Sequence, residues 1–184
     1  MDRREALQLT AALLGTSVFG ASAFLSGCSS PGRTPGALTD EELPLLNALC
    51  EAILPATSKS PGAGAAKVGK FVLAIVNDCY SDKEAQVFES GIRSLQRKVK
   101  EVYGKEFLKL NSEDQSKLLT EYDKEAQEYE DKDAPHFYSM LLQLTLWGFF
   151  ISEPGATQAL RYNPIPGRYE GCIPYEKGQS AWAS

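Results

Sequence analysis

Apolar side chains recur at helical spacing along most of the chain from residue 39 onward. The clearest stripe starts at Val68. Its members are Val68, Phe71, Val72, Ile75, Val76 and Cys79. Side chains at this spacing share one face of an α-helix, so the segment is predicted to be an amphipathic helix. The pattern puts Cys79 on the buried side, where a free thiol behaves as a small hydrophobic group.

The segments before and after this stripe begin with capping signals. The run from Thr39 to Glu42 matches a capping box, and Pro44 is expected to delay the first regular turn. Ser81 and Glu84 form a second capping box ahead of a longer helix, for which Gly104 is a natural stop. The residues expected to point inward from these two helices are Leu46, Leu49, Cys50, Ile53, Leu54, Phe88, Ile92, Leu95, Val99 and Val102.

A further helix is predicted to begin at Ser112, which can serve as its N-cap with Gln115 three residues later. Its apolar face comprises Leu118, Leu119, Tyr122, Ala126 and Tyr129. The opposite side is dense in charged residues, as expected for a solvated face. Earlier in the chain, residues 55–65 are rich in Pro, Gly and Ser and predict a loop. The glycines at Gly62 and Gly64 are interpreted as flexible linker rather than as a phosphate cradle.

The last helical segment, residues 137–151, contains no charged side chain. It is too short to cross a bilayer, which takes about 20 apolar residues. A helix that is apolar on nearly all sides is normally buried on all sides, so we expect the central helix of a small bundle. The alternative is that one side, formed by Trp147, Phe149 and Phe150, is covered by a partner protein.

The tail that starts at Glu153 is rich in Pro, Gly, Tyr and Arg. Apart from one short helix near residues 156–161, its prolines and glycines argue against regular structure. Because Tyr, Trp and Arg are enriched at interfaces, we favour contact with a partner protein over a tail that folds back to close the bundle. The residues predicted to form the partner interface are Trp147, Phe150, Arg161, Tyr162, Arg168, Tyr169 and Cys172.

The predicted fold is all-α, because no stretch shows a convincing alternation of apolar and polar residues that would indicate a strand. We expect a compact bundle of about five helices with a long irregular Pro/Gly/Tyr/Arg-rich C-terminal tail. Together they form one domain, residues 39–184. A Ser/Pro/Gly-rich flexible tether, residues 28–38, precedes this domain.

The N-terminal segment carries two processing signals. Arg3 and Arg4 precede a soft apolar run, and residues 25–28 (Leu-Ser-Gly-Cys) resemble the cleavage and lipid-attachment box of a bacterial lipoprotein. We predict that residues 1–27 are a twin-arginine signal peptide and that Cys28 carries lipid. The domain would then be exported folded and held on the periplasmic side of a bacterial membrane. The alternative is an uncleaved anchor helix.

The cysteine count bears on the disulfides. If Cys28 carries lipid, then Cys50, Cys79 and Cys172 remain, and an odd number in an oxidising compartment indicates a free thiol or a bond to another chain. Cys172 lies in the irregular tail and is the cysteine least constrained by a helix. It is the candidate for an intermolecular disulfide or for pairing with Cys79.

Few residues suggest chemistry in this chain itself. The net charge of −5 argues against binding to nucleic acid, which rewards clustered Lys and Arg. The sequence has no CxxC pair, dinucleotide fingerprint or P-loop. His136, the one histidine, stands at a helix start, where a structural role is usual, and a base would need a positioned partner. We therefore expect no catalytic, cofactor-binding or metal-binding residue.

The tail also carries a family resemblance. Residues 152–162 (SEPGATQALRY) and 164–172 (PIPGRYEGC) resemble the C-terminal signature of the gluconate 2-dehydrogenase subunit 3 family. Further similarity lies upstream, at residues 38–39, 53–57, 77–80 and 144–146. The resemblance covers nearly the whole mature chain.

The resemblance implies a non-catalytic small subunit of a periplasmic, membrane-associated dehydrogenase for sugars or sugar acids. In this family the partner is a glucose–methanol–choline type flavoprotein that holds FAD, and a cytochrome c often accepts the electrons. The small subunit carries neither flavin nor haem and often supplies the twin-arginine signal. The lipid-attachment box is not universal in the family, which leaves open whether a cytochrome provides the membrane anchor here. The substrate is left open between gluconate-type acids, glycosides and other polyols.

Two other functions remain as alternatives from the residues alone. One is a stand-alone helical lipoprotein that acts as a binding or structural module. The other is a stand-alone enzyme, which a single histidine and the lack of a cofactor motif in the sequence argue against.

Overall fold

The computed structural model describes residues 38–130, 135–165, 167–168 and 171–183. Contacts divide the chain into two units, Met1–Pro35 and Gly36–Ser184, and all described residues belong to the second. The predicted export and lipidation residues Arg3, Arg4 and Cys28 lie outside the described residues, as does Tyr169.

The described part of the chain contains five α-helices, as the hydrophobic periodicity predicts. They are α2 (Leu43–Ile53), α3 (Val68–Asp78), α4 (Asp82–Tyr103), α5 (Ser112–Gln127) and α6 (Phe137–Phe150). The shorter elements are η1 (Asp40–Glu42), η2 (Phe107–Lys109), η3 (Gly155–Ala159), β1 (Arg161–Tyr162) and β2 (Trp182–Ala183). The all-α fold class is therefore confirmed.

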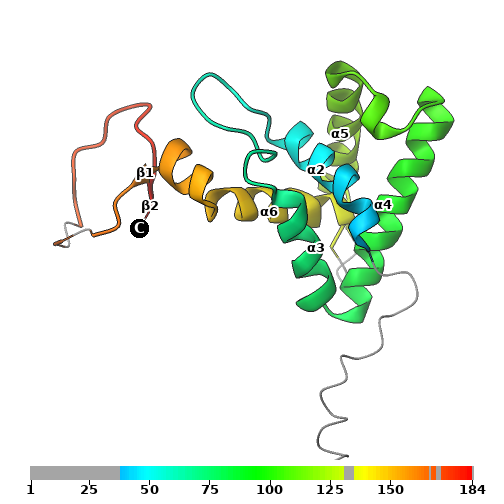
Figure 1. Cartoon of the computed structure of the whole chain (residues 1–184), viewed down its shortest axis with the longest axis horizontal. Coiled ribbons are helices and arrows are strands. Elements are labelled where there is room, and N and C mark those ends of the chain that lie inside the picture. The colour runs from blue at the N-terminus through cyan, green and yellow to red at the C-terminus, as the bar shows by residue number, and fades with distance from the viewer. Residues whose placement is uncertain (1–37, 131–134, 166, 169–170, 184) are drawn as a thin grey trace, which may run out of the picture. The chain divides into compact units, whose positions relative to one another are not determined.

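Helix α6 is the centre of the bundle. It contacts each of the other four helices, and Figure 1 shows it leading on to η3. Side chains from all five helices meet in one hydrophobic core, and those with no exposed surface include Leu46, Leu49, Val72, Val76, Phe88, Leu95 and Leu141. The interpretation of residues 137–151 as a central helix is confirmed.

The start of the domain differs slightly from the predicted boundary. Leu38, expected at the end of the tether, is buried in the core, and its carbonyl oxygen accepts a hydrogen bond from Asn77 Nδ2 at 3.0 Å. The capping box of Thr39 and Glu42 is present, with the Glu42 carboxylate 2.7 Å from the Thr39 backbone nitrogen. It caps the 3₁₀ turn η1, and Pro44 stands in the first turn of α2, so regular helix begins after the box.

Two further helix ends follow simple chemistry. The Ser81 and Glu84 capping box opens α4, and Gly104 closes it in the left-handed conformation.

The predicted cap at Ser112 is wrong by one residue. Asn111 is the N-cap of α5, and its side chain accepts a hydrogen bond from the Asp114 backbone N–H at 2.8 Å. Asn is as good a cap as Ser, so sequence preference did not separate the two.

Three side chains assigned to the buried faces are exposed instead. Cys79 follows the last residue of α3, Val102 lies in the last turn of α4, and Tyr129 lies beyond the end of α5. Each extends a correct apolar stripe past the point where other helices cover it. The stripe marks the face of a helix, and the packed neighbours decide where burial stops.

The loop between α2 and α3 is organised by one carboxylate. Glu51 accepts hydrogen bonds from the backbone N–H of Ala56 at 3.0 Å and of Gly64 at 2.6 Å. The backbone at Gly62 also comes close to this carboxylate. The interpretation of the two glycines as flexible linker is therefore wrong: they let the loop approach Glu51.

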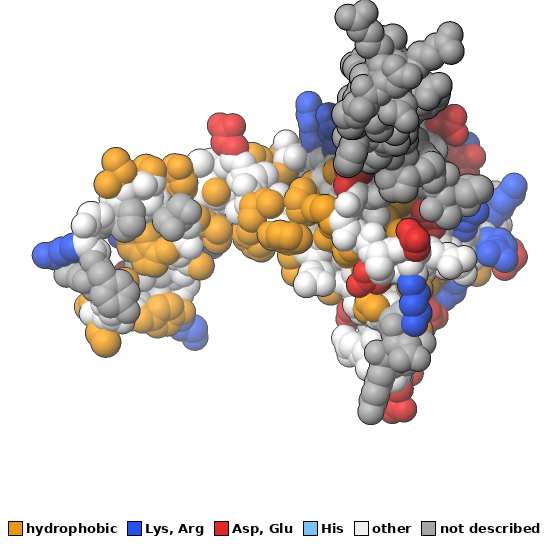
Figure 2. All heavy atoms as spheres, turned by 90° about the horizontal axis from the view of Figure 1, so that it is seen from below, with side chains coloured by type: hydrophobic (Ala, Val, Ile, Leu, Met, Phe, Trp, Pro, Cys, Tyr) orange, Lys and Arg blue, Asp and Glu red, His pale blue; other side chains and the backbone are white. Residues whose placement is uncertain are grey.

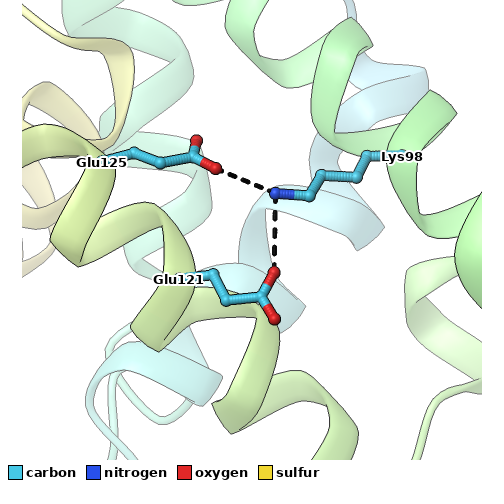
Figure 3. A network of polar contacts seen from close by, with 3 residues as sticks. All are labelled: Lys98, Glu121 and Glu125. Carbon is cyan, nitrogen blue, oxygen red and sulfur yellow. Dashed lines mark hydrogen bonds and ion pairs between the residues drawn. The ribbon is translucent and has the colours of Figure 1, made fainter.

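Charged side chains link α4 and α5 at the surface. The Lys98 ammonium lies 3.0 Å from the Glu125 carboxylate and 3.5 Å from that of Glu121, and Figure 3 shows it between the two. Partial burial works to lower the pKa of Lys98, but the hydrogen bond to Glu125 and the nearby negative groups raise it overall. The Lys98 ammonium also lies 4.6 Å from the centre of the Tyr122 ring. Because all three charged side chains remain partly in water, we expect a contribution of about 1 kcal/mol or less.

Candidate partner interface

The C-terminal half of α6 carries an exposed apolar patch. It consists of Leu146, Trp147, Phe150 and Ile151, and we call it the α6 patch. Trp147 exposes 52% of its surface. Figure 2 shows apolar side chains along this part of the molecule and over the elements that follow it. The expectation that α6 is buried on all sides is therefore wrong for its last turns.

At the C-terminal end of α6, aromatic packing decides which side chains are buried and which are exposed. Phe149, which the sequence grouped with the exposed side, is only 1% exposed and belongs to the core. Trp147 instead packs edge-on against Phe71 of α3, with ring centres 5.5 Å apart. Phe150 makes a similar edge contact with Phe149. The aromatic side chains of the patch therefore pack on Phe149 of the core and on Phe71, which is partly buried against the core.

A tight turn directs the chain away from the end of α6. The Ser152 hydroxyl donates to the Phe149 carbonyl oxygen at 2.5 Å and accepts from the Gly155 backbone N–H at 3.2 Å. An added Cβ at Gly155 would lie 1.9 Å from the Phe149 carbonyl oxygen, so a larger residue cannot occupy this position without moving the backbone. The π-helical turn η3 follows directly and replaces the ordinary short helix expected near residues 156–161.

The tail contains a small sheet that the sequence pattern did not predict. Strands β1 and β2 pair in parallel, with Arg161 opposite Trp182. The Arg161 backbone N–H donates to the Ala181 carbonyl oxygen, and the Asn163 N–H donates to that of Ala183, both at 2.8 Å. Two-residue strands are too short to show alternation in the sequence, so periodicity could not reveal them.

The described tail residues are mainly exposed, as far as the structure covers them. Tyr162, Arg168 and Cys172, all predicted interface residues, are exposed, and so is Arg161. Every described residue from 164 to 182 is exposed, so this segment is not buried against the bundle. The alternative that the tail folds back to close the bundle does not describe this structure.

The cysteines fall into two environments. Cys50 is buried at the α2–α6 contact, where burial raises the pKa of its thiol to about 11. The Thr145 hydroxyl lies 3.4 Å from its sulfur atom. Cys79 and Cys172 are exposed free thiols, and no disulfide joins them in the structure. Thiolate is the reactive form, so Cys50 is suited to packing rather than to chemistry.

His136 acts as a helix cap, in line with the structural role expected for it. Its Nδ1 atom accepts a hydrogen bond from the Tyr138 backbone N–H at 3.3 Å, at the N-terminus of α6. Burial lowers the pKa of His136, which favours the neutral ring that this contact requires. The rings of Tyr129 and Phe137 both contact the imidazole, with centres 5.2 and 4.9 Å from it.

Among the described residues, no group of three or more His, Cys, Asp or Glu side chains is placed to hold a metal ion. No helix in that part of the chain combines the length and the apolarity needed to cross a membrane.

Several exposed apolar residues were not among the interface residues predicted from the sequence. They are Leu146, Ile151, Ile165, Ile173, Tyr175 and Trp182. Leu146 and Ile151 lie on the same side of the helix as the exposed Gln143, which could have marked that side, but the polar Thr145 is buried and pointed the other way. The tail residues could have been found, because an irregular Pro/Gly-rich segment has little means of burying its own apolar side chains.

Comparison with known proteins gives one result. Residues 40–167 match the family model described as gluconate 2-dehydrogenase subunit 3. Neither the search of curated proteins nor the search of solved structures gives a match. The match spans both α6 and η3, and thus the α6 patch and the turn beside it. Since it covers more than half of the chain, this protein belongs to the gluconate 2-dehydrogenase subunit 3 family.

Proposed function

We propose that this chain is a non-catalytic small subunit of an FAD-dependent sugar or sugar-acid dehydrogenase, and that it docks on the flavoprotein through the α6 patch. The observation that carries the proposal is this patch, which is exposed in a chain whose family is described as a subunit. The partner is a glucose–methanol–choline type flavoprotein, which supplies the FAD and the catalytic groups. A cytochrome c subunit is a further candidate partner of the assembled complex.

The physical character of the patch supports docking to a protein. Trp147 and Phe150 are large, and aromatic residues in a desolvated centre dominate many interfaces. Burying apolar surface gains roughly 25 cal/mol per Å², and the patch itself carries no charge that would lose hydration. Its aromatic members rest on Phe71 and Phe149 and are therefore ordered before a partner arrives.

Export and membrane attachment belong to the same proposal. Twin-arginine export accepts folded proteins, and a flavoprotein must fold around its cofactor before it crosses the membrane. Arg3 and Arg4 would then serve as the export address for both subunits, and lipid on Cys28 would hold the complex on the periplasmic side. Support comes from the sequence motifs, which lie outside the described residues.

The docking test uses the full chain co-expressed with a flavoprotein of this type from the same organism. The double variant Trp147→Glu/Phe150→Glu should lose co-purification of the flavoprotein, because two carboxylates would have to be buried in the contact. Val102→Glu is the matched control, since Val102 is an exposed apolar residue on α4, outside the patch. Circular dichroism should show all variants folded.

The results separate the proposal from its alternative. Co-purification that survives the double variant would refute docking through the α6 patch. A wild-type chain that never retains a flavoprotein would instead favour the stand-alone lipoprotein acting as a binding or structural module.

A further inference from the structure

The described residues between the two tail strands form a loop that is closed at its base. Strands β1 and β2 supply two backbone hydrogen bonds there. The Arg161 guanidinium lies over the Trp182 ring, 4.0 Å from its centre. We call this arrangement of Arg161, Trp182 and the two strands the clasp, and the described residues between the strands (163–165, 167–168 and 171–181) the tail loop.

The tail loop presents apolar side chains that its own chain does not bury. Ile165 exposes 81% of its surface and Tyr175 exposes 77%, and Ile173 is exposed as well. Side chains of this kind, displayed together on one short segment, mark a surface that another molecule covers. Proline and glycine along the loop also limit the internal structure it can form, so its order depends on the clasp.

The contacts of the clasp stabilise the closed loop by a small free energy, so a single substitution should change it measurably. A two-stranded sheet alone is marginal in water. A cation–π contact at an exposed site adds roughly 0.5–1 kcal/mol. Without the Trp182 ring, the two backbone hydrogen bonds would have to hold a loop of about twenty residues by themselves, against the entropy of closing it.

We propose that the tail loop is a second docking element for the flavoprotein subunit, and that Arg161 and Trp182 are positioning residues that hold it ready to bind. This inference rests on the proposed function, because it names the same partner. Holding a loop in its bound form lowers the entropy lost on association and so strengthens binding. The clasp acts on the loop and need not itself touch the partner.

The continuity of the surface favours the flavoprotein as the occupant. Strand β1 contacts η3, and η3 in turn contacts α6, so one short element separates the base of the clasp from the helix that carries the α6 patch. A segment that binds a lipid surface is rich in Lys and Arg beside its apolar side chains. The sequence between β1 and β2 carries two basic residues, Arg168 and Lys177, and two acidic residues, Glu170 and Glu176, which fits a protein surface better.

The experiment compares Trp182→Ala with Trp182→Phe in the full chain, free and co-expressed with the flavoprotein. Phe keeps an aromatic face for Arg161, whereas Ala removes it. In the free subunit, Trp182→Ala should speed hydrogen exchange at the Arg161 and Asn163 amides. In the complex, the wild-type tail loop should gain protection, and Trp182→Ala should weaken binding roughly two- to fivefold. Trp182→Phe should stay close to the wild type in both measurements.

The results that would contradict this inference differ from those that would contradict the proposed function. If the flavoprotein binds the wild type while the loop gains no protection, or if Trp182→Ala binds equally well, the docking loop is wrong and the proposed function stands. If the wild type retains no flavoprotein, both fail. Binding of the loop to vesicles with anionic lipid, or Trp182-dependent self-association in sedimentation, in place of protection by the flavoprotein would also overturn the proposal.

Discussion

At the scale of single residues, the Cys50 thiol is defined by its burial. Its side chain is fully covered, and Thr145 lies beside it on α6. We expect a maleimide reagent at neutral pH to label Cys79 and Cys172 quickly in the reduced native protein, and Cys50 only after denaturation. Peptide mapping by mass spectrometry assigns the label. Rapid native labelling of Cys50 would contradict the packing described for α2 and α6.

Because of the Cys50 thiol, the free energy of unfolding should depend on pH in the alkaline range. Burial raises the pKa of Cys50 from 9.0 to about 11, so between these values the unfolded chain has lost the proton that the folded chain retains. The free energy of unfolding should therefore fall with rising pH in this range, by roughly 1.4 kcal/mol per unit. Cys50→Ala should lose stability at neutral pH and show a shallower alkaline decline.

Gly91 in the middle of α4 illustrates a close approach that sequence alone does not show. A Cβ there would lie 2.1 Å from Cγ of the buried Phe137 ring. Helix propensity predicts that Gly91→Ala stabilises the protein by about 1 kcal/mol. We expect instead a loss of about 1–3 kcal/mol, because the ring must leave its place. Urea unfolding measures it, with Ser94→Ala, an exposed position on α4, as the control expected to change little.

At the scale of helices, the cap of α4 should govern part of the acid response. The Ser81 hydroxyl and backbone hold the pKa of Glu84 below its usual value of 4.5. A lowered carboxyl pKa stabilises the fold above the unfolded pKa, and this stabilisation is lost as the pH falls through the folded value. Ser81→Ala should cost about 1 kcal/mol at neutral pH.

The Glu84→Gln variant removes the negative charge of that cap and keeps its hydrogen-bonding geometry. Glutamine can still accept the hydrogen bond from Ser81, so stability at pH 7 should stay near the wild type. Below pH 4.5 the variant should lose less stability than the wild type, as followed by the urea midpoint at each pH. Identical acid profiles for the two proteins would show that the Glu84 charge does not matter.

Helices were predictable from the sequence, but their ends were less so. The stripe from Val68 to Val76 identified α3 because a repeated spacing on one face needs no knowledge of neighbours. Cys79 fits the same spacing yet lies exposed after the last turn. Burial there depends on which other helix lies alongside, and that is a property of the assembled bundle.

At the scale of the whole molecule, the limit of prediction is α6 itself. Its composition correctly indicated a central helix, yet it could not show which side remains open. Thr145 and Phe149 are buried, whereas Trp147 and Phe150 between and after them are exposed. Gln143 lies one turn before Leu146 and Trp147 and is exposed as well, whereas Thr145 is polar yet buried, so the polar positions mark the open side only in part. The candidate interface was therefore predictable in its residue types and only partly in its extent.

Export and attachment can be separated in the intact complex, because the two signals act at different steps. Arg3→Lys/Arg4→Lys should leave both subunits in the cytoplasm, since the twin-arginine route requires the arginine pair. Cys28→Ser should allow export and release both subunits from the membrane into the soluble periplasmic fraction. Cell fractionation followed by flavin-dependent dye reduction locates the partner in each strain.

If the flavoprotein reaches the periplasm in the Lys-Lys strain, this chain does not carry its export address. If it stays at the membrane in the Cys28→Ser strain, another subunit provides the anchor, and a cytochrome c is then the first candidate.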